Sequence, residues 1–491
     1  MKRIGIIASE CQPFFASGGL ADVIGSLPKR MLKQMNEEEP TEMFVILPLY
    51  SKFTDESYQK KLEYIGQTTV TLAWRKQYCG IFKYSKDGIT YYFLDNEYYF
   101  KKSNFYGYFD DGERFAFFSK ASIDVMKYLN IIPNILHCHD WQTGLVPVYL
   151  RTIYYDDPAF VNVLKVFTIH NIEYQGIYSY DYDILEDVFG IPEKYGYLLE
   201  YKGQINILKG AMESSNKVTT VSPTYAEEIQ YDYYAKGLSI EVKRIKDEGK
   251  LEGILNGIDK TFYNPKSDKA LFVQYDKTTP ELKIENKLKL QEMLGLHVSS
   301  DIPMIGMVTR LVDHKGLGLL KEIITEIVKE NVQLVILGTG DAYYEWFLRD
   351  IAHTFSNKVS VIISFNADLS RKIYASSDIF LMPSLAEPCG LAQMIACRYG
   401  ALPLVRKTGG LNDSIKDFSL KDGNGYVFEK PSSAELLDKL KTALNDYENK
   451  EEWIKKVKKA MSCDFGWSAS AKRYVELYKE LENEESKWTK I

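Results

Sequence analysis

Short apolar runs alternate with helical or turn sequence through the first half of the chain. The run IGIIAS at residues 4–9 has the form of a buried parallel strand, and a turn with two adjacent glycines leads from it into a helix expected to start near Leu20. Comparable apolar or β-branched runs occupy residues 43–50, 134–140, 163–170 and 217–222. Strands and helices that alternate in this way predict a parallel α/β sheet with right-handed crossovers.

A second series of buried-strand runs begins near residue 302. Its members are IPMIGMVTR, VQLVILGTGD, VSVIISF, DIFLMPS and ALPLVR, with helical stretches between several of them. Between the two series, Asn, Gly, Asp and Pro cluster in ILNGIDKTFYNP at residues 254–265, as they do in linkers. The pattern predicts two Rossmann-like domains that face a central cleft. The charged stretch 437–484 is expected to form terminal helices with solvated faces.

The composition of the chain mainly excludes certain partners and kinds of site. A chain of 491 residues, 45% hydrophobic and 26% charged, is ordinary for a globular protein and too long for one core. The net charge of −6 offers no basic surface to nucleic acid, and no apolar stretch reaches the ~18 residues of a membrane span. Six scattered cysteines without a CxxC pair form neither a disulfide framework nor a zinc motif. We therefore expect a cytoplasmic protein with no nucleic-acid or membrane partner.

Residues directly after the strand runs are the first candidates for chemistry, because open parallel sheets bind ligands beyond the carboxyl ends of their strands. Gly18 and Gly19 follow the first run, where a bare backbone allows close approach and the next helix presents its N-terminus to an anion. Arg310 and Lys315 lie in TRLVDHKG, after the run that starts at residue 302. A rigid guanidinium fork and a mobile ammonium suit an anionic leaving group such as a diphosphate.

Two further segments follow strand runs. In PSLAEPCGLAQMIA, at residues 383–396, Glu387 precedes the expected start of a helix whose amides could hold phosphate while the carboxylate faces a sugar. Alternatively, Glu387 only caps the dipole of that helix. In RKTGGLNDSI, at residues 406–415, a second Gly-Gly turn leads into a helix.

Two patterns imitate binding motifs and are discounted. His137 and His139 in HCHD share one strand face like metal ligands, but no third ligand cluster accompanies them, so no metal site is predicted. The segment LGTGD at residues 337–341 lacks the third glycine of a dinucleotide fingerprint.

Nine segments taken together resemble the family of bacterial glycogen synthases and plant starch synthases along nearly the whole chain. They occur in the family's order: SGGLADVIGSLPK, YYFLDNEYYF, YGYFDDGERFAFF, HCHDWQTGLVP, TIHNIEYQG, ILNGID, TRLVDHKG, AEPCGLAQMIACRYG and RKTGGL. The resemblance implies a GT-B fold with three parts. These are an N-terminal acceptor-side domain (1–254), a nucleotide-sugar domain (255–466), and a C-terminal helix (467–491) that packs back on the first domain.

The resemblance also implies an activity, the retaining transfer of glucose from ADP-glucose to the non-reducing end of an α-1,4-glucan, without a cofactor. Glu387 matches the carboxylate beside the transferred glucose, and Arg310 and Lys315 match the pair that neutralises the diphosphate. His170 matches the residue at the C6 side of the sugar, and Asp140 matches an acidic active-site residue. The remaining matches are donor-binding positions: Gly18, Gly19, Asp22, Asn256, Phe365 against the adenine, Cys389, Gly390, Leu391, Thr408, Gly409 and Gly410.

The chain departs from the family pattern at several positions. Ala16 and Ser17 stand where many relatives have Lys-Thr, so a cation often assigned to the donor phosphates is missing. Leu385 and Ala386 replace an Arg-Phe pair, and His314 replaces a frequent Gln. Ala16 keeps open the alternative of a catalytically impaired glucan-binding relative. A GT-B transferase with another donor, such as UDP-glucose, or another acceptor is a further alternative.

The chemistry needs stabilisation of negative charge on the departing diphosphate. Arg310, Lys315 and helix N-termini can supply it, so metal independence is expected. Retention of the α-linkage leaves two routes open. One uses Glu387 or Asp140 as a nucleophile, and the other is front-face attack assisted by the leaving phosphate.

Overall fold

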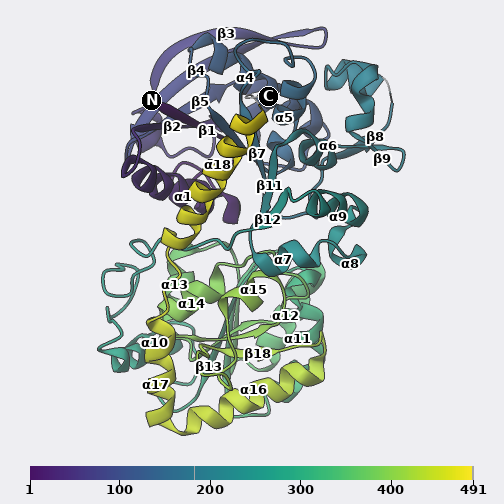
Figure 1. The fold of residues 1–491 in the computed structure, drawn as a ribbon. Coiled ribbons are helices and arrows are strands. Elements are labelled where there is room, and N and C mark those ends of the chain that lie inside the picture. Colours follow the sequence, from purple (N-terminus) through teal and green to yellow (C-terminus); the bar gives the residue numbers. More distant parts are fainter. Residues whose placement is uncertain (182, 489–491) are drawn as a thin grey trace. The chain divides into compact units, whose positions relative to one another are not determined.

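The computed structural model describes residues 1–181 and 183–488, and it divides into two compact units. Unit 1 comprises Met1–Asn256 and the segment from Trp467, and unit 2 comprises Gly257–Gly466 (Figure 1). Within the described residues, no helix is both long and apolar enough to cross a membrane.

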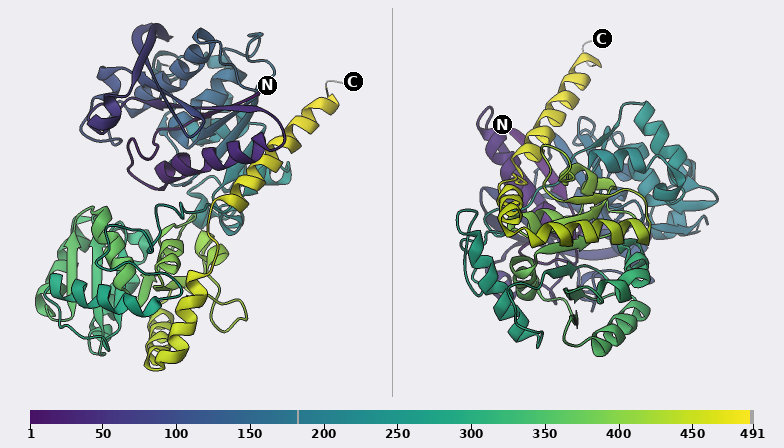
Figure 2. Two further views of the ribbon diagram at one scale, coloured as in Figure 1. Left: turned by 90° about the vertical axis from the view of Figure 1, so that its left-hand side faces the viewer. Right: turned by 90° about the horizontal axis from the view of Figure 1, so that it is seen from below.

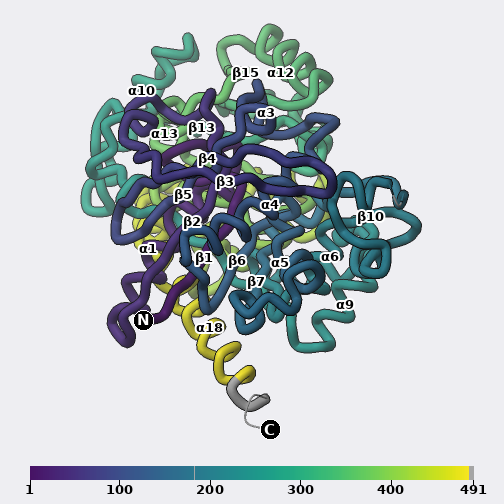
Figure 3. Tube along the Cα trace, turned by 90° about the horizontal axis from the view of Figure 1, so that it is seen from above, coloured from purple at the N-terminus to yellow at the C-terminus, as the bar shows by residue number. Residues whose placement is uncertain are grey.

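The main sheet among the described residues of unit 1 has nine strands, in the order β12-β11-β7-β6-β1-β2-β5-β4-β3. Its parallel part contains the predicted runs, and Figure 3 shows β5, β2, β1, β6 and β7 following one another. The strands are β1 (Lys2–Ile7), β2 (Thr41–Pro48), β3 (Glu63–Leu72), β4 (Arg75–Lys86), β5 (Ile89–Asp95), β6 (Ile135–His139), β7 (Leu164–Ile169), β11 (Lys217–Thr220) and β12 (Leu251–Gly253). A small antiparallel sheet joins β8 (Ile177–Ser179), β10 (Gln204–Asn206) and β9 (Glu200–Tyr201).

The strands β3, β4 and β5, which pair antiparallel with one another in chain order, are absent from the sequence-based prediction. β3 is mostly exposed and alternates in polarity, so it lacks the continuous apolar run of a buried parallel strand. The turn between β4 and β5 is Asp87-Gly88, with φ of 54° and 80°. Asp-Gly between two β-rich runs is a strong hairpin signal, and it was available in the sequence.

Helix α18 (Ser468–Trp488) belongs to unit 1 and packs against α1 (Gly19–Asn36), as Figure 2 shows. Tyr474, Leu477 and Tyr478 on α18 are almost fully buried. The expected return of this helix to the N-terminal unit is therefore confirmed, and the helix buries one face that the sequence-based prediction did not mention. The other helices of unit 1 are α2 (Glu56–Gln59), α3 (Glu97–Phe100), α4 (Asp111–Tyr128), α5 (Leu145–Arg151), α6 (Ile207–Ser214), α7 (Pro223–Glu228), α8 (Asp232–Ala235) and α9 (Ser239–Asp247).

Unit 2, which is described throughout, has a six-stranded sheet in the order β15-β14-β13-β16-β17-β18, with every neighbouring pair parallel. Its strands are β13 (Met304–Val308), β14 (Gln333–Gly338), β15 (Val359–Ile363), β16 (Ile379–Met382), β17 (Leu402–Arg406) and β18 (Tyr426–Phe428). Its helices are α10 (Lys283–Met293), α11 (Leu317–Ile327), α12 (Ala342–Thr354), α13 (Ala367–Ser376), α14 (Ala392–Arg398), α15 (Gly409–Ser414), α16 (Ser433–Glu448) and α17 (Lys450–Met461).

Both sheets have a topological switch point, where the strand order reverses direction. In unit 1 it lies between β1 and β6, and in unit 2 between β13 and β16. Loops that leave adjacent strands at such a point diverge to opposite sides of the sheet and leave a crevice for a ligand. A ligand of either unit is therefore expected to bind at the segments that follow these four strands.

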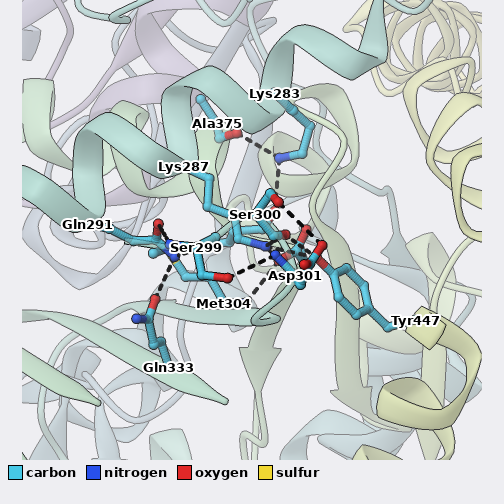
Figure 4. Close-up of polar contacts among 12 residues, drawn as sticks. Lys283, Lys287, Gln291, Ser299, Ser300, Asp301, Met304, Gln333, Ala375 and Tyr447 are labelled. Carbon is cyan, nitrogen blue, oxygen red and sulfur yellow. Dashed lines mark hydrogen bonds and ion pairs between the residues drawn. The ribbon is translucent and has the colours of Figure 1, made fainter. Parts of the chain in front are cut away.

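Buried polar side chains on one face of helix α10 form hydrogen bonds to several other segments of unit 2 (Figure 4). Lys283, Lys287 and Gln291 are four residues apart, so they share one helix face, and all three are buried. The Lys283 ammonium donates to the carbonyls of Ala375 (2.7 Å) and Ser377 (2.8 Å) at the end of α13, where carbonyls lack helical partners. Burial lowers the pKa of Lys283 to about 7.

The Lys287 ammonium meets Asp378 Oδ2 at 2.8 Å and also donates to the Ser300 carbonyl and the Tyr447 hydroxyl. Replacing Lys287 by methionine should lower the free energy of unfolding by about 3–5 kcal/mol, because the buried carboxylate loses its cation. Urea unfolding followed by circular dichroism measures the change. Lys289→Met, on the exposed face of the same helix, is the matched control. Equal stability of the two variants would contradict a structural role for the ion pair.

Candidate active site

The segment after β1 is organised around the carboxylate of Glu10, which is 3% exposed. This carboxylate accepts hydrogen bonds from the Ser17 hydroxyl (2.6 Å), the Gly18 amide (3.2 Å), the Ser17 amide and the Tyr106 hydroxyl. Glu10 thus holds two of the amides that lead into α1, where the helix dipole favours negative charge. The sequence-based prediction missed Glu10, although its position directly after a buried strand marks it.

Gly18 and Gly19 are exposed at the start of α1. Gly18 has extended backbone, and a Cβ built on it would meet nothing within 4 Å. Neither backbone strain nor packing within unit 1 therefore requires glycine at position 18. A glycine in an open position is consistent with a surface that a ligand approaches closely. Asp22 lies one turn further along α1. The amide of Gly18 is, however, directed at Glu10, which the sequence alone did not indicate.

Asp140 follows β6, across the switch point from Glu10. Its backbone has φ of 57° and ψ of 173°, an unfavourable region for a residue with a side chain. The carboxylate accepts the amide of His170 at 2.7 Å. Burial raises the pKa of Asp140 to about 7. The backbone amides of His170 and Asn171 lower this pKa, and the nearby Glu10 carboxylate raises it. A carboxyl group that titrates near neutrality can exchange a proton at physiological pH.

The predicted pair on one strand face, His137 and His139, is real, with ring centroids 4.2 Å apart. Both ring nitrogens of His137 are engaged, by Tyr478 OH (2.7 Å) and Thr168 Oγ1 (2.6 Å). His139 Nδ1 lies 3.0 Å from His170 Nε2. Among the described residues, no three His, Cys, Asp or Glu side chains are grouped so as to hold a metal ion. These nitrogens instead form a buried hydrogen-bond network.

Asn256, the last residue of unit 1, is 7% exposed, and its Oδ1 is buried without a partner in the described part of the chain. An unsatisfied buried acceptor is costly, so a hydroxyl or amine of a ligand is a natural partner for it.

In unit 2, the loops after β13 and β16 meet at the switch point. The Lys315 ammonium contacts both carboxylate oxygens of Glu387, at 2.9 and 2.7 Å, and the Ser384 hydroxyl donates to Glu387 Oε2 at 3.0 Å. The carboxylate side chain is 7% exposed. The alternative that Glu387 only caps a helix does not account for this ion pair.

The two loops are joined by their backbones as well. The amide of Leu385 donates to the carbonyl of His314 at 2.8 Å. Gly316 has φ of 78°, and a Cβ there would lie 2.0 Å from the carbonyl oxygen of Pro383, so only glycine fits. Arg310 is exposed in the same loop. The loop is therefore packed so that Lys315 faces Glu387.

The second Gly-Gly turn has a different role from the first. A Cβ on Gly409 would lie 1.9 Å from the carbonyl oxygen of Glu387, and one on Gly410 would lie 2.2 Å from that of Cys389. The amide of Gly410 donates to the Glu387 carbonyl at 3.1 Å. These glycines let the segment from Thr408, which is buried, pack against the backbone that carries Glu387. Packing is thus a sufficient reason for both.

Arg406, at the end of β17, was missed by the sequence-based prediction. Its buried guanidinium donates to the carbonyls of Ser384 (2.8 Å) and Leu385, and so holds the segment that precedes Glu387. Gly390 has φ of 70°, and the side-chain amide of Gln393 donates to its carbonyl at 2.8 Å. Cys389 is buried and Leu391 is half-buried. The backbone around Glu387 is therefore fixed from several directions.

Phe365 follows β15 and is 89% exposed. A flat apolar ring left in water beyond the carboxyl end of a strand is a platform on which an aromatic base can stack.

Comparisons with known proteins find similar glycosyltransferases along nearly the whole chain. Residues 3–243 match the family model described as starch synthase catalytic domain, and residues 296–460 match glycosyl transferases group 1. A glycogen synthase of Anoxybacillus flavithermus is 44% identical over 98% of both chains. One of Clostridioides difficile is 42% identical over 98% of this chain and 99% of its own.

Two solved structures are similar. The catalytic domain of starch synthase IV from Arabidopsis thaliana, bound to ADP and acarbose, has a TM-score of 0.88 and 32% identity, covering 98% of this chain and 99% of its own. A sucrose-phosphate synthase from Thermosynechococcus elongatus has a TM-score of 0.62 with 15% identity, covering 98% of this chain and 100% of its own, so it supports the fold alone.

Proposed function

The chain belongs to the family of glycogen and starch synthases, and on that premise we propose that its donor is ADP-glucose. The fold is GT-B, with two parallel-sheet units, and the enzyme is a glucosyltransferase that elongates α-1,4-glucan from a nucleotide sugar. ADP is the nucleotide bound to the similar Arabidopsis starch synthase structure. That likeness and the exposed ring of Phe365 support adenine in the donor.

The observation that carries the assignment of the donor site is the Lys315–Glu387 contact at the switch point of unit 2. In this proposal, Lys315 and Arg310 neutralise the diphosphate as the C1–O bond breaks, and fixed charges of this kind are worth ~3–4 kcal/mol each in a dry site. Glu387 holds the ammonium in place and faces the glucosyl group. As the family resemblance implies, Asn256 and His170 are proposed to bind hydroxyls of the sugar.

Retention of the α-linkage is part of the proposal. Both oxygens of Glu387 are engaged by Lys315, and one also by Ser384, which makes this carboxylate a poor nucleophile. Front-face attack, in which the leaving phosphate accepts the proton of the acceptor hydroxyl, requires no free carboxylate at C1. We therefore favour that route over a covalent intermediate on Glu387.

The donor assignment is tested by nucleotide release from ADP-glucose and UDP-glucose, each with and without glycogen. We expect glycogen-dependent ADP release and a kcat/KM at least tenfold higher for ADP-glucose, roughly 1.4 kcal/mol of discrimination. A preference for UDP-glucose would overturn the donor assignment. Glycogen binding without release of either nucleotide would identify an impaired glucan-binding relative.

The same assay tests independence from divalent metals. Activity should be unchanged after dialysis against EDTA, because Arg310 and Lys315 already oppose the charge of the diphosphate. Complete loss of activity that magnesium or manganese restores would contradict this prediction.

Replacing Ala16 by lysine is expected to change the activity only slightly. The Glu10 carboxylate already shapes the turn from Ser17 to Gly18, and the cationic pair of unit 2 is present, so the enzyme should be active without a lysine at position 16. Ala16→Lys should change kcat/KM for the donor by no more than about tenfold. Ala16→Met, similar in length but uncharged, is the control. An inert wild type that Ala16→Lys activates would contradict the prediction.

A further inference from the structure

Three histidines lie in a row: His137 within β6, His139 at its end, and His170 directly after β7. His137 stacks on His139, and the His139 ring in turn contacts the His170 ring, with centroids 5.2 Å apart. The Nδ1 of His139 and the Nε2 of His170 share a hydrogen bond of 3.0 Å. One nitrogen must donate and the other accept, so this bond couples the tautomer of His170 to that of His139.

His139 is itself firmly held. Its backbone amide donates to Thr143 Oγ1 at 2.7 Å, and the Thr143 hydroxyl donates back to the His139 carbonyl at 2.8 Å. Its ring rests on His137, whose two nitrogens are bound by Tyr478 and Thr168. His139 is only 1% exposed, so it cannot meet a ligand itself. His170 is partly exposed.

Both members of the pair are neutral at physiological pH. Burial lowers the pKa of His170 to about 3, and burial with the neighbouring imidazoles lowers the pKa of His139 well below its usual range. A neutral imidazole has one N–H and one lone pair. With Nε2 of His170 committed to His139, Nδ1 is the nitrogen that can bind a ligand.

We propose that His139 is a positioning residue: it fixes the ring and the tautomer of His170 so that Nδ1 meets a sugar hydroxyl. The Asp140 carboxylate holds the backbone amide of His170 at the same time, so main chain and ring are held separately. This inference rests on the proposed place of His170 at the C6 hydroxyl of the donor glucose.

The test compares kcat/KM for ADP-glucose with that for ADP-6-deoxyglucose. The wild type should prefer the donor with the hydroxyl, and His170→Ala should abolish the preference. His139→Gln, whose amide replaces Nε2 rather than Nδ1, should reduce the preference about tenfold, the cost of one misplaced polar contact. His139→Asn, whose amide overlies Nδ1, should keep it within about threefold.

Two controls separate positioning from general damage. His137→Asn retains the bond to Tyr478 and should lower stability without changing the preference for the C6 hydroxyl. The double variant His139→Gln/His170→Ala should have no lower kcat/KM for ADP-glucose than His170→Ala alone, since His139 acts only through His170.

An unchanged preference in folded His139→Gln would overturn the inference, and so would independent, multiplying losses in the double variant. If the wild type does not distinguish the two donors, or His170→Ala keeps the preference, the assignment of His170 to C6 fails instead. If neither donor reacts with the wild type, the proposed donor fails.

Discussion

Replacing Glu387 by alanine should lower kcat for transfer by at least about 10³-fold while ADP binding changes little. The carboxylate holds the Lys315 ammonium with both oxygens at the switch point of unit 2, and in the proposal it faces the glucosyl group rather than the nucleotide. Its loss therefore affects the transition state more than the ground state. Steady-state kinetics and calorimetric titration with ADP measure the two effects.

Glu429→Ala is the matched control for Glu387→Ala, because Glu429 is an exposed carboxylate of unit 2 paired with Lys407. It should leave both activity and ADP binding unchanged, since exposed ion pairs contribute little. If folded Glu387→Ala lost ADP binding together with activity, the carboxylate would serve chiefly to organise the phosphate site, and its assignment to the sugar would be wrong.

Lys315→Ala and Arg310→Ala should each reduce kcat/KM by about 10²–10³-fold, because each removes positive charge from the departing diphosphate. The structure separates the two variants in stability. Lys315→Ala leaves the buried Glu387 carboxylate without its cation, which costs about 3–5 kcal/mol. Arg310 is exposed, so its removal should cost much less. Thermal unfolding of the purified variants measures this difference.

A double variant distinguishes stability from catalysis. Lys315→Ala/Glu387→Ala removes both partners of the buried pair, so it should be more stable than Lys315→Ala alone and yet remain inactive. Lys407→Ala, which breaks the exposed pair, is the control for loss of a lysine. Near-normal turnover in Lys315→Ala and Arg310→Ala would remove both residues from the mechanism.

The parallel cores of both sheets could be predicted from the sequence because each buried strand is a continuous apolar run. β1, β6, β13 and β16 lie within or beside the predicted segments, and these are the strands that border the two switch points. The strands β3, β4 and β5 were not predicted, and in β3 and β4 exposed positions interrupt the hydrophobic run. In that region the local Asp87-Gly88 turn was the more informative signal.

The candidate site could be predicted as a set of residues but not as a set of contacts. Lys315 and Glu387 are 72 positions apart, and only the parallel pairing of β13 with β16 brings their loops together. His139 and Arg406 act through hydrogen bonds to loops that are distant in sequence, so no local pattern distinguishes them from core residues. The same holds for Gly409, whose close neighbour is a carbonyl of another loop. Glu10, by contrast, is marked by its position directly after a buried strand.

Extension of a defined primer tests the central claim most directly. Maltoheptaose incubated with the purified protein and radiolabelled ADP-glucose should yield a ladder of longer chains, one glucose at a time. Because transfer is proposed to retain the α-linkage at the non-reducing end, β-amylase should release the label from these chains as maltose. The account would be contradicted if the primer stayed at seven residues while the donor was hydrolysed to glucose, or if the added label resisted β-amylase.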